Sequence, residues 1–182
     1  KYLPASGSPG ILAVSFTRRA VANLRRAMPE DMKANCMTIH AALEYEPVYY
    51  TIIDPVTGEE RNTMRFEPTR NSIRPLPSSI RTCIIDESSM VSLELYKELS
   101  NALPSNCQYI FLGDIQQLPP VFGSAILGYK MLELPTTELV QVYRQALESP
   151  IIRLAHRILS GKPIPSSEYP EWKFPGKLTI HP

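Results

Sequence analysis

Two adjacent carboxylates, Asp86 and Glu87, directly follow the apolar run Thr82–Ile85. Open α/β sheets place their ligands outside the carboxyl ends of their strands, so a strand over this run would deliver both carboxylates to such a position. Because adjacent residues at a strand end can point differently, one carboxylate could hold Mg²⁺ through its water shell while the other orients and deprotonates an attacking water. The alternative interpretation is a solvated turn without a chemical role.

A second polar segment follows the apolar run Tyr109–Leu112. It reads Gly-Asp-Ile-Gln-Gln-Leu-Pro-Pro over residues 113–120, and its prolines stiffen the backbone. The uncharged amide of Gln116 or Gln117 can hydrogen-bond a phosphate or an attacking water without competing for a metal. The other interpretation is a proline-stiffened surface loop, which leaves unexplained why two successive strand ends both carry groups suited to a site.

A sheet is needed to hold these segments, and the sequence predicts one. Apolar runs of strand length occur at Ile11–Ser15, Thr82–Ile85 and Tyr109–Leu112, and each is followed by polar or turn residues and then a helical pattern. Continuous apolar runs are typical of parallel strands that are buried on both faces. The predicted fold class is therefore α/β, with a mainly parallel sheet.

Three helices are predicted around this sheet. The first spans 18–28 and places its apolar residues on one face, with these side chains mostly on the other: Arg18, Arg19, Arg25 and Arg26. The second begins after Ser92, a candidate N-cap, and ends before Pro104. The third spans 150–160, with Gly161 as its C-terminal stop.

One segment departs from the α/β alternation. Residues 48–53 are all β-branched or aromatic, residues 54–58 read Asp-Pro-Val-Thr-Gly, and a charged strand-like run ends at Phe66. This pattern predicts a β-hairpin. Residues 67–79 hold three prolines and few core residues, so we expect them to be the return linker from a small inserted subdomain. A last strand is expected over 178–180.

Composition limits the class of protein. The 182 residues are 43% hydrophobic, which suffices for one domain with a core and a small insertion, and the formal net charge of +1 excludes a global basic field. The three cysteines, Cys36, Cys83 and Cys107, lie in apolar runs, which favours core thiols in a reduced compartment. Without a membrane-length apolar stretch or a signal-peptide pattern, we expect a soluble protein, cytoplasmic or nuclear and not secreted.

Five segments together resemble the motifs of superfamily 1 helicases. Residues 85–90, Ile-Asp-Glu-Ser-Ser-Met, resemble the Walker B motif II, and residues 113–120 resemble motif III. The matches to motif Ia, the Thr-x-His motif and motif IV are Ser15-Phe16-Thr17, Thr38-Ile39-His40 and Val142-Tyr143-Arg144-Gln145. They follow the family's order across nearly the whole chain. The hairpin before motif II is similar to that of the 5′-to-3′ branch, which includes RecD-like, Pif1-like and phage Dda-like helicases.

The resemblance implies a RecA-like P-loop NTPase sheet, here partial, with a small inserted β-hairpin subdomain. Residues 1–44 and 81–182 are expected to form two parts of motor domain 1A, and residues 45–80 the inserted pin that splits a duplex. The implied activity is ATP-dependent 5′-to-3′ DNA helicase or translocase, with ATP and Mg²⁺ as cofactors. The implied partners are single-stranded DNA and junctions of single- and double-stranded DNA, together with a single-stranded DNA-binding protein or another replication or repair protein.

The resemblance also gives each matching residue a role at the nucleotide. Asp86 would bind Mg²⁺ through water, and Glu87 would be the general base. Gln117 would sense the γ-phosphate, and Arg144 would reach it as an arginine finger, so all four would contact the nucleotide. For Arg144 the alternative is a surface ion pair.

DNA would be held mainly through phosphates, because a translocating motor must grip the backbone rather than the sequence. Thr17, Thr38 and His40 are expected to make these contacts, although His40 could instead be packed in the core. Phe16 could stack on a base or belong to the core.

Basic and apolar residues complete the expected DNA surface. Arg18 and Arg19 could contact phosphates or could only solvate a helix face. Val56 lies at the expected hairpin tip, where no aromatic residue occurs between Asp54 and Glu60. We therefore expect the tip to separate strands by its bulk.

The sequence contains no Gly-rich loop ending in Gly-Lys-Ser/Thr, which a helicase needs to cradle the β- and γ-phosphates. In the family this loop precedes motif Ia and a second motor domain follows, so we expect a fragment that is inactive alone. One alternative is a catalytically silent single-stranded DNA-binding or scaffolding module, which would not need Glu87, Gln117 and Arg144. Another is a P-loop ATPase acting on protein or RNA, against which the Thr-x-His segment and the hairpin weigh.

Overall fold

The computed structural model describes residues 10–139 and 150–162. The described residues divide into two units, one ending at Pro135 and the other beginning at Thr136. The first unit contains a sheet, the helices around it and a long hairpin, and the second contains helix α6, Pro150–Leu159. Arg144 and the strand expected over 178–180 lie outside the described residues.

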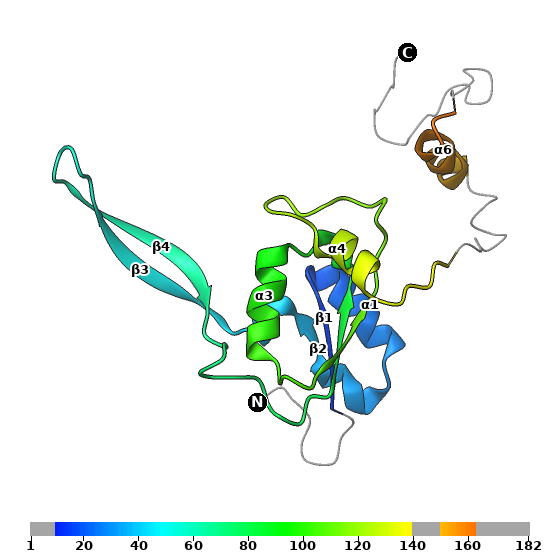
Figure 1. The fold of residues 1–182 in the computed structure, drawn as a ribbon, viewed down its shortest axis with the longest axis horizontal. Helices are drawn as coiled ribbons and strands as arrows, with labels where there is room; N and C mark the ends of the chain where they lie inside the picture. Colours follow the sequence, from blue (N-terminus) through cyan, green and yellow to red (C-terminus); the bar gives the residue numbers. More distant parts are fainter. Residues whose placement is uncertain (1–9, 140–149, 163–182) are drawn as a thin grey trace. The chain divides into compact units, whose positions relative to one another are not determined.

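Four parallel strands form the sheet of the first unit, in the order β2-β1-β5-β6 (Figure 1). Their bounds are Ile11–Ser15 for β1, Cys36–Thr38 for β2, Thr82–Asp86 for β5 and Gln108–Phe111 for β6. The three predicted apolar runs therefore form strands within one residue of their expected ends. Together with the hairpin, this sheet confirms the predicted fold class, a mixed α/β fold consistent with a partial RecA-like sheet.

The remaining elements of this unit are helices that follow the strand ends: α1 (Arg18–Ala27), η1 (Glu30–Asn35), α2 (Ile39–Ala42), η2 (Ser88–Met90), α3 (Leu93–Ala102) and α4 (Ile126–Glu133). α3 begins at its predicted N-cap, because the Ser92 hydroxyl accepts a hydrogen bond from the Leu95 amide at 3.2 Å. At the end of α6, Gly161 has a φ of 66°, which confirms it as the helix stop.

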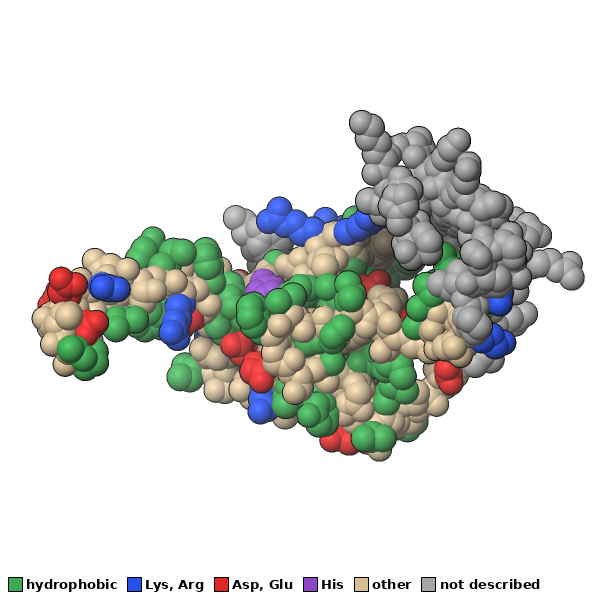
Figure 2. Space-filling model, turned by 90° about the horizontal axis from the view of Figure 1, so that it is seen from above, with side chains coloured by type: hydrophobic (Ala, Val, Ile, Leu, Met, Phe, Trp, Pro, Cys, Tyr) green, Lys and Arg blue, Asp and Glu red, His purple; other side chains and the backbone are tan. Residues whose placement is uncertain are grey.

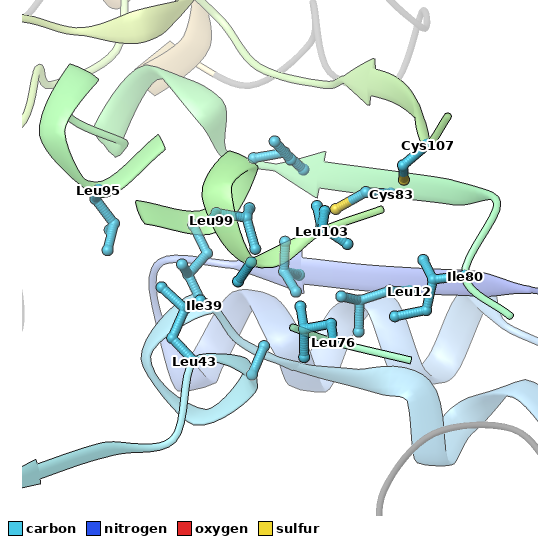
Figure 3. Close-up of a cluster of buried hydrophobic side chains, with 14 of the residues drawn as sticks. Leu12, Ile39, Leu43, Leu76, Ile80, Cys83, Leu95, Leu99, Leu103 and Cys107 are labelled. Carbon is cyan, nitrogen blue, oxygen red and sulfur yellow. The ribbon is translucent and has the colours of Figure 1, made fainter. Parts of the chain in front are cut away.

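Apolar side chains cover the sheet on two faces. α3 packs on one face, where Leu95 and Leu99 belong to one cluster of buried side chains with Leu12 and Ile85. Figure 3 shows part of this cluster, including Leu103, which follows α3. α1 packs on the other, where Val21 and Leu24 meet Ala13. All three cysteines are free and buried, which confirms them as core thiols. Both faces of a parallel sheet need such cover, because side chains emerge from both.

The predicted hairpin is confirmed and is longer than expected. β3 (Tyr45–Ile53) pairs antiparallel with β4 (Glu60–Pro68) along its whole length. At the tip, the Asp54 carboxylate accepts hydrogen bonds from the backbone amides of Val56 (2.8 Å) and Thr57 (3.1 Å), which lower its pKa. The tip is therefore an ordered turn. Hydrophobic and charged side chains are both exposed along the hairpin (Figure 2).

The return linker begins later than predicted, because residues 67 and 68 belong to β4, and residues 69–79 carry one core side chain. Leu76 is buried, and its amide donates to the Ala102 carbonyl at 2.7 Å. The linker is thus fastened to the end of α3 before Ile80 enters the core. In the described part of the chain, no helix has the length and apolarity that crossing a membrane requires.

We predict that Leu99→Ala strongly destabilises the first unit. Leu99, on the face of α3 that meets the sheet, is 0% exposed and belongs to the main core cluster. Truncating a buried leucine removes its transfer free energy and leaves a cavity, so the free energy of unfolding should fall by about 2–5 kcal/mol. Urea unfolding followed by circular dichroism measures the change. The exposed neighbour Lys97 is the control, since Lys97→Ala should stay within about 0.5 kcal/mol of the parent.

Candidate functional site

The carboxyl ends of three strands lie level with one another at one edge of the sheet. Ser15, the last residue of β1, is aligned with Thr38 of β2 and with Asp86 of β5. Each strand then leads into a helix or turn that begins at this edge. Residues from three separate segments of the sequence are therefore brought together at the position where open α/β sheets bind ligands.

Asp86 and Glu87 occupy the end of β5. Asp86 is partly buried, and Glu87 has φ 52° and ψ 41°, which is the left-handed region. A residue other than glycine rarely adopts this conformation unless its surroundings enforce it. The chain turns sharply here into η2, closed by a hydrogen bond from the Met90 amide to the Glu87 carbonyl at 3.1 Å. The backbone therefore changes direction directly after Asp86.

Ser88 ties this turn to the end of β6. Its amide and its hydroxyl both donate to the Leu112 carbonyl, at 2.9 and 2.8 Å. Gly113 follows at once, and a Cβ there would lie 2.7 Å from the Ser88 hydroxyl oxygen, so only glycine fits without a shift. The segment after Asp86 and the segment after β6 are consequently fixed against each other.

The loop that starts at Gly113 is exposed and ordered by its own hydrogen bonds. The Asp114 carboxylate accepts from the Gln116 amide at 2.8 Å, and the Asp114 carbonyl accepts from the Gln117 amide at 3.1 Å. The side chain of Gln117 is exposed and free to reach a ligand at this edge. The end of the loop is attached to the start of α3, where the Leu93 amide donates to the Ser124 carbonyl at 2.8 Å.

Thr17 and Thr38 perform the same local task at the ends of β1 and β2. Each is a helix N-cap whose side-chain oxygen accepts a backbone hydrogen bond, from Ala20 at 3.2 Å and from Ala41 at 3.1 Å. An N-cap uses a lone pair of the hydroxyl and leaves its proton available to donate. Both threonines can therefore donate a hydrogen bond to an oxygen atom bound beside them.

His40 lies in an aromatic cluster next to these threonines. Its ring meets Phe16 edge-on at 5.7 Å and Tyr45 at 4.9 Å between centroids. Burial lowers the pKa of His40, and the charge of Glu98 opposes this effect. The imidazole is thus partly buried and partly accessible, so neither the core role nor the ligand role foreseen for it is excluded. Phe16 likewise packs against the core.

The four arginines of α1 differ in their contacts. Arg25 donates to the Cys36 carbonyl through Nε (3.1 Å) and a terminal nitrogen (2.8 Å), and Arg26 contacts Asn23. Arg18 and Arg19 are exposed, and within the described residues neither makes a hydrogen bond or ion pair. Both stand in the first turn of a helix without an acidic residue there, where the helix dipole disfavours positive charge and favours an anion.

A magnesium ion fits this edge only as part of a nucleotide complex. In the described part of the chain, no group of three or more His, Cys, Asp or Glu residues could hold a metal by itself. Mg²⁺ is usually held by one or two carboxylates, water and substrate phosphates, a set that Asp86 can begin. The hydroxyl of Ser15, aligned with Asp86, is buried and has no hydrogen-bond partner among the described residues. This unsatisfied hydroxyl lies at the same level of the sheet as Asp86.

Two other expected site residues are not among the residues at this edge that the structure describes. Val56 is at the hairpin tip, 91% exposed and remote in sequence from the strand ends. Arg144 lies outside the described residues, so its role stays a prediction.

Sequence reasoning missed four residues that shape this region. Ser88 looked like an ordinary motif position, although its hydroxyl joins two strand ends. Ser15 was noted only as the first residue of the motif Ia match at a strand end. The hydrogen bond from Tyr45 to Glu98 joins residues 53 positions apart, and no spacing rule links them.

A family model described as an AAA domain matches residues 3–123. Curated relatives include the ATP-dependent RecD2 DNA helicase of Deinococcus radiodurans, 32% identical over 174 residues that cover 92% of this chain and 22% of that protein. The ATP-dependent DNA helicase dda of Enterobacteria phage T4 is 29% identical over 167 residues, covering 88% of this chain and 33% of that protein. An uncharacterized protein, R530, of Acanthamoeba polyphaga mimivirus is 36% identical over 92 residues, which cover 49% of this chain and 17% of that protein.

The chain thus spans between 17% and 33% of the length of these relatives. The family model matches well over half of the chain and includes the ends of β1, β5 and β6. On these matches, the chain belongs to the AAA-domain family, in its RecD-like and Dda-like group of superfamily 1 DNA helicases.

Proposed function

We propose that this chain supplies part of the first motor domain of an ATP-dependent DNA helicase that moves 5′-to-3′ along single-stranded DNA. The observation that carries the proposal is the shared strand edge, where the ends of β1, β2 and β5 are level and Ser88 joins β5 to β6. This edge places acidic, amide and hydroxyl groups within one region, as coupled nucleotide and DNA contacts require. The names of two relatives, both ATP-dependent DNA helicases, support the same activity.

At the nucleotide, Asp86 binds Mg²⁺ through water and Glu87 accepts a proton from the attacking water. When bound, Mg²⁺ neutralises charge on the β- and γ-phosphates. Gln117 contacts the γ-phosphate from its exposed loop, and Arg144 stabilises transition-state charge as an arginine finger. The left-handed turn at Glu87 supports two separate roles for adjacent carboxylates, since it sends the chain away from Asp86.

At the DNA, Thr17 and Thr38 donate hydrogen bonds to phosphates through the protons that their capping role leaves free. Arg18 and Arg19 add charge, and His40 adds a neutral donor. Phe16 supports His40 through its ring contact and is a further candidate for base contact.

The hairpin, with Val56 at its tip, is the wedge that meets a junction of single- and double-stranded DNA. In this proposal residues 1–44 and 81–182 belong to motor domain 1A, and residues 45–80 form the inserted pin. The cellular setting is DNA replication or repair in the cytoplasm or nucleus, in company with a single-stranded DNA-binding protein or another repair partner.

A second candidate function is a catalytically silent module that binds single-stranded DNA or scaffolds other proteins. The hydroxyls of Thr17 and Thr38 and the exposed Arg18 and Arg19 would suffice for it, because such groups can contact phosphates without hydrolysis. The strained conformation of Glu87 and the exposed amide of Gln117 weigh against it, because binding alone needs neither.

A chimera separates these two functions. We expect that RecD2 of Deinococcus radiodurans, with its matching segment replaced by this chain, hydrolyses Mg²⁺-ATP faster when single-stranded DNA is added. Glu87→Gln should lower this rate by on the order of 10²–10⁴-fold, since it removes the general base. DNA binding by both proteins is the folding control. Hydrolysis that survives Glu87→Gln contradicts the role of Glu87, and DNA binding without any hydrolysis favours the silent module.

Replacing Arg18 and Arg19 together by alanine should weaken binding of single-stranded DNA by the chain. Each lost phosphate contact should reduce the slope of log affinity against log salt by about 0.7, because fewer counterions are released. Fluorescence anisotropy with a labelled oligonucleotide at several salt concentrations measures both quantities. Arg26→Ala is the matched control, since Arg26 is on the same helix and contacts Asn23. An equal loss in both variants would indicate a general charge effect instead.

The lowered pKa of His40 predicts a pH dependence of stability. In the unfolded chain histidine titrates near pH 6.5, so as the pH falls below about 6.5 the unfolded state takes up a proton before the folded state does. The free energy of unfolding should therefore be largest above that pH and decrease as the pH is lowered below it. His40→Gln should remove this part of the slope, measured by urea unfolding across the range. Equal slopes for parent and variant would mean that His40 is not partly buried.

A further inference from the structure

The hairpin joins the sheet at its root, which consists of residues 43–45 and 69–70. Hydrogen bonds at the root hold the two strands together. Leu43 and Glu44 precede β3, and Thr69 and Arg70 follow β4. The amides of Thr69 and Arg70 both donate to the Leu43 carbonyl at 3.1 Å, and the Thr69 hydroxyl donates to the Glu44 carbonyl at 3.0 Å. The two ends of the insertion are thereby joined to each other where they leave the core.

Charge reinforces this root. Glu44 has a φ of 51°, a left-handed conformation that a glutamate adopts only under constraint. Its carboxylate accepts from Arg70 at 2.9 Å and pairs with Arg74 at 3.1 Å, and the hydrogen bond from Arg70 is the main cause of its lowered pKa. The conformation and the ion pairs support each other, because the turn at Glu44 points its carboxylate toward the linker.

One contact links the hairpin to a helix of the sheet unit. The hydroxyl of Tyr45, the first residue of β3, donates to the carboxylate of Glu98 on α3. Burial and Glu98 both raise the pKa of Tyr45, so the hydroxyl keeps its proton and remains a donor. The same ring packs against His40. Tyr45 therefore connects His40, which is expected to contact DNA, with α3.

Beyond its root, the hairpin has little to hold its direction. Its large side chains, among them Tyr49, Ile53 and Phe66, are exposed. Two-stranded hairpins in water are only marginally stable by themselves. The direction of this hairpin must consequently be set at the root, where Tyr45 meets α3.

We propose that Tyr45 and Glu98 are positioning residues that hold the hairpin in a fixed direction relative to α3, so that a DNA junction meets a rigid wedge. The inference rests on the proposed function, in which the hairpin acts on DNA. Hydrogen bonds to an ionised acceptor are stronger than those between neutral groups, which suits a contact that resists a load.

Three substitutions separate the hydrogen bond from the packing around it. Tyr45→Phe removes the hydroxyl and keeps the ring against His40. Glu98→Ala removes the acceptor, whereas Glu98→Gln keeps an acceptor without its charge. Tyr50→Phe is the matched control, because the Tyr50 hydroxyl also donates to a glutamate, Glu67, but within the hairpin itself.

The direction of the hairpin can be measured in the purified chain by pulsed electron paramagnetic resonance. Spin labels are placed at Val56→Cys on the tip and Asn101→Cys on α3, both at exposed positions, while the native cysteines are buried. We expect a narrow distribution of label distances in the parent. Tyr45→Phe and Glu98→Ala should broaden or shift it, Glu98→Gln less so, and Tyr50→Phe should leave it unchanged.

The proposal is overturned if Tyr45→Phe gives a distribution as narrow as the parent's, or if Tyr50→Phe broadens it equally. Circular dichroism shows which variants are folded. If Tyr45→Phe fails to fold, Glu98→Ala decides the matter, because it removes the acceptor and leaves the Tyr45 ring in place.

Binding of forked and single-stranded DNA supplies the functional readout. The parent should bind the fork more tightly, and Tyr45→Phe should lose this preference while its affinity for single strands is unchanged. A parent without any fork preference would refute the proposed role of the hairpin, whereas the label distances would still decide the role of Tyr45. A preference that survives Tyr45→Phe would refute the positioning role alone.

Discussion

The structure depends on one geometric constraint, the level ending of parallel strands at a single edge of the sheet. A parallel ladder fixes the register along each strand, so the alignment of Ser15 with Thr38 and Asp86 follows once the interior residues pair. Packing of α1 and α3 on the two faces then holds this register, because a slip of one residue would exchange the side chains that fit against α1 with those that fit against α3. For this reason the ends of β1, β2 and β5, which are separate in sequence, lie at one edge of the sheet. The packing of the core alone is enough to bring them together.

Polar contacts at that edge convert proximity into fixed geometry. The Leu112 carbonyl accepts two hydrogen bonds from Ser88, which leaves the turn at Glu87 little freedom to relax from its left-handed conformation. Gly113 is required beside it for the same contact. A displacement at the end of β5 must therefore move the end of β6, and the reverse holds as well. This link makes a coupled response to a bound phosphate possible.

The sequence predicted β1, β5, β6, the helices α1, α3 and α6, and the hairpin because their signals are local, whereas the short β2 and α2 and the helix α4 were not predicted. Apolar runs, the Ser92 cap and the Asp54–Gly58 turn each depend on residues a few positions apart. It could not separate Arg18 and Arg19 from Arg25, since only the fold shows that the guanidinium of Arg25 is occupied by the Cys36 carbonyl. The Tyr45 and Glu98 contact was invisible for a related reason: side-chain pairs between distant segments have no spacing rule. The roles of Glu87, Gln117 and Arg144 remain predictions.

Departures from local rules gather at the strand edge and at the hairpin root. Two arginines stand at the positive end of a helix dipole, Glu87 and Glu44 adopt left-handed conformations, and the Ser15 hydroxyl is buried without a partner among the described residues. Each of these costs stability in isolation. A sequence selected for folding alone would remove them, for example with an acidic first turn in α1 or glycine at position 44. Their retention at the strand edge and at the hairpin root is what a motor requires, since both places must hold a geometry that binding and load would otherwise relax.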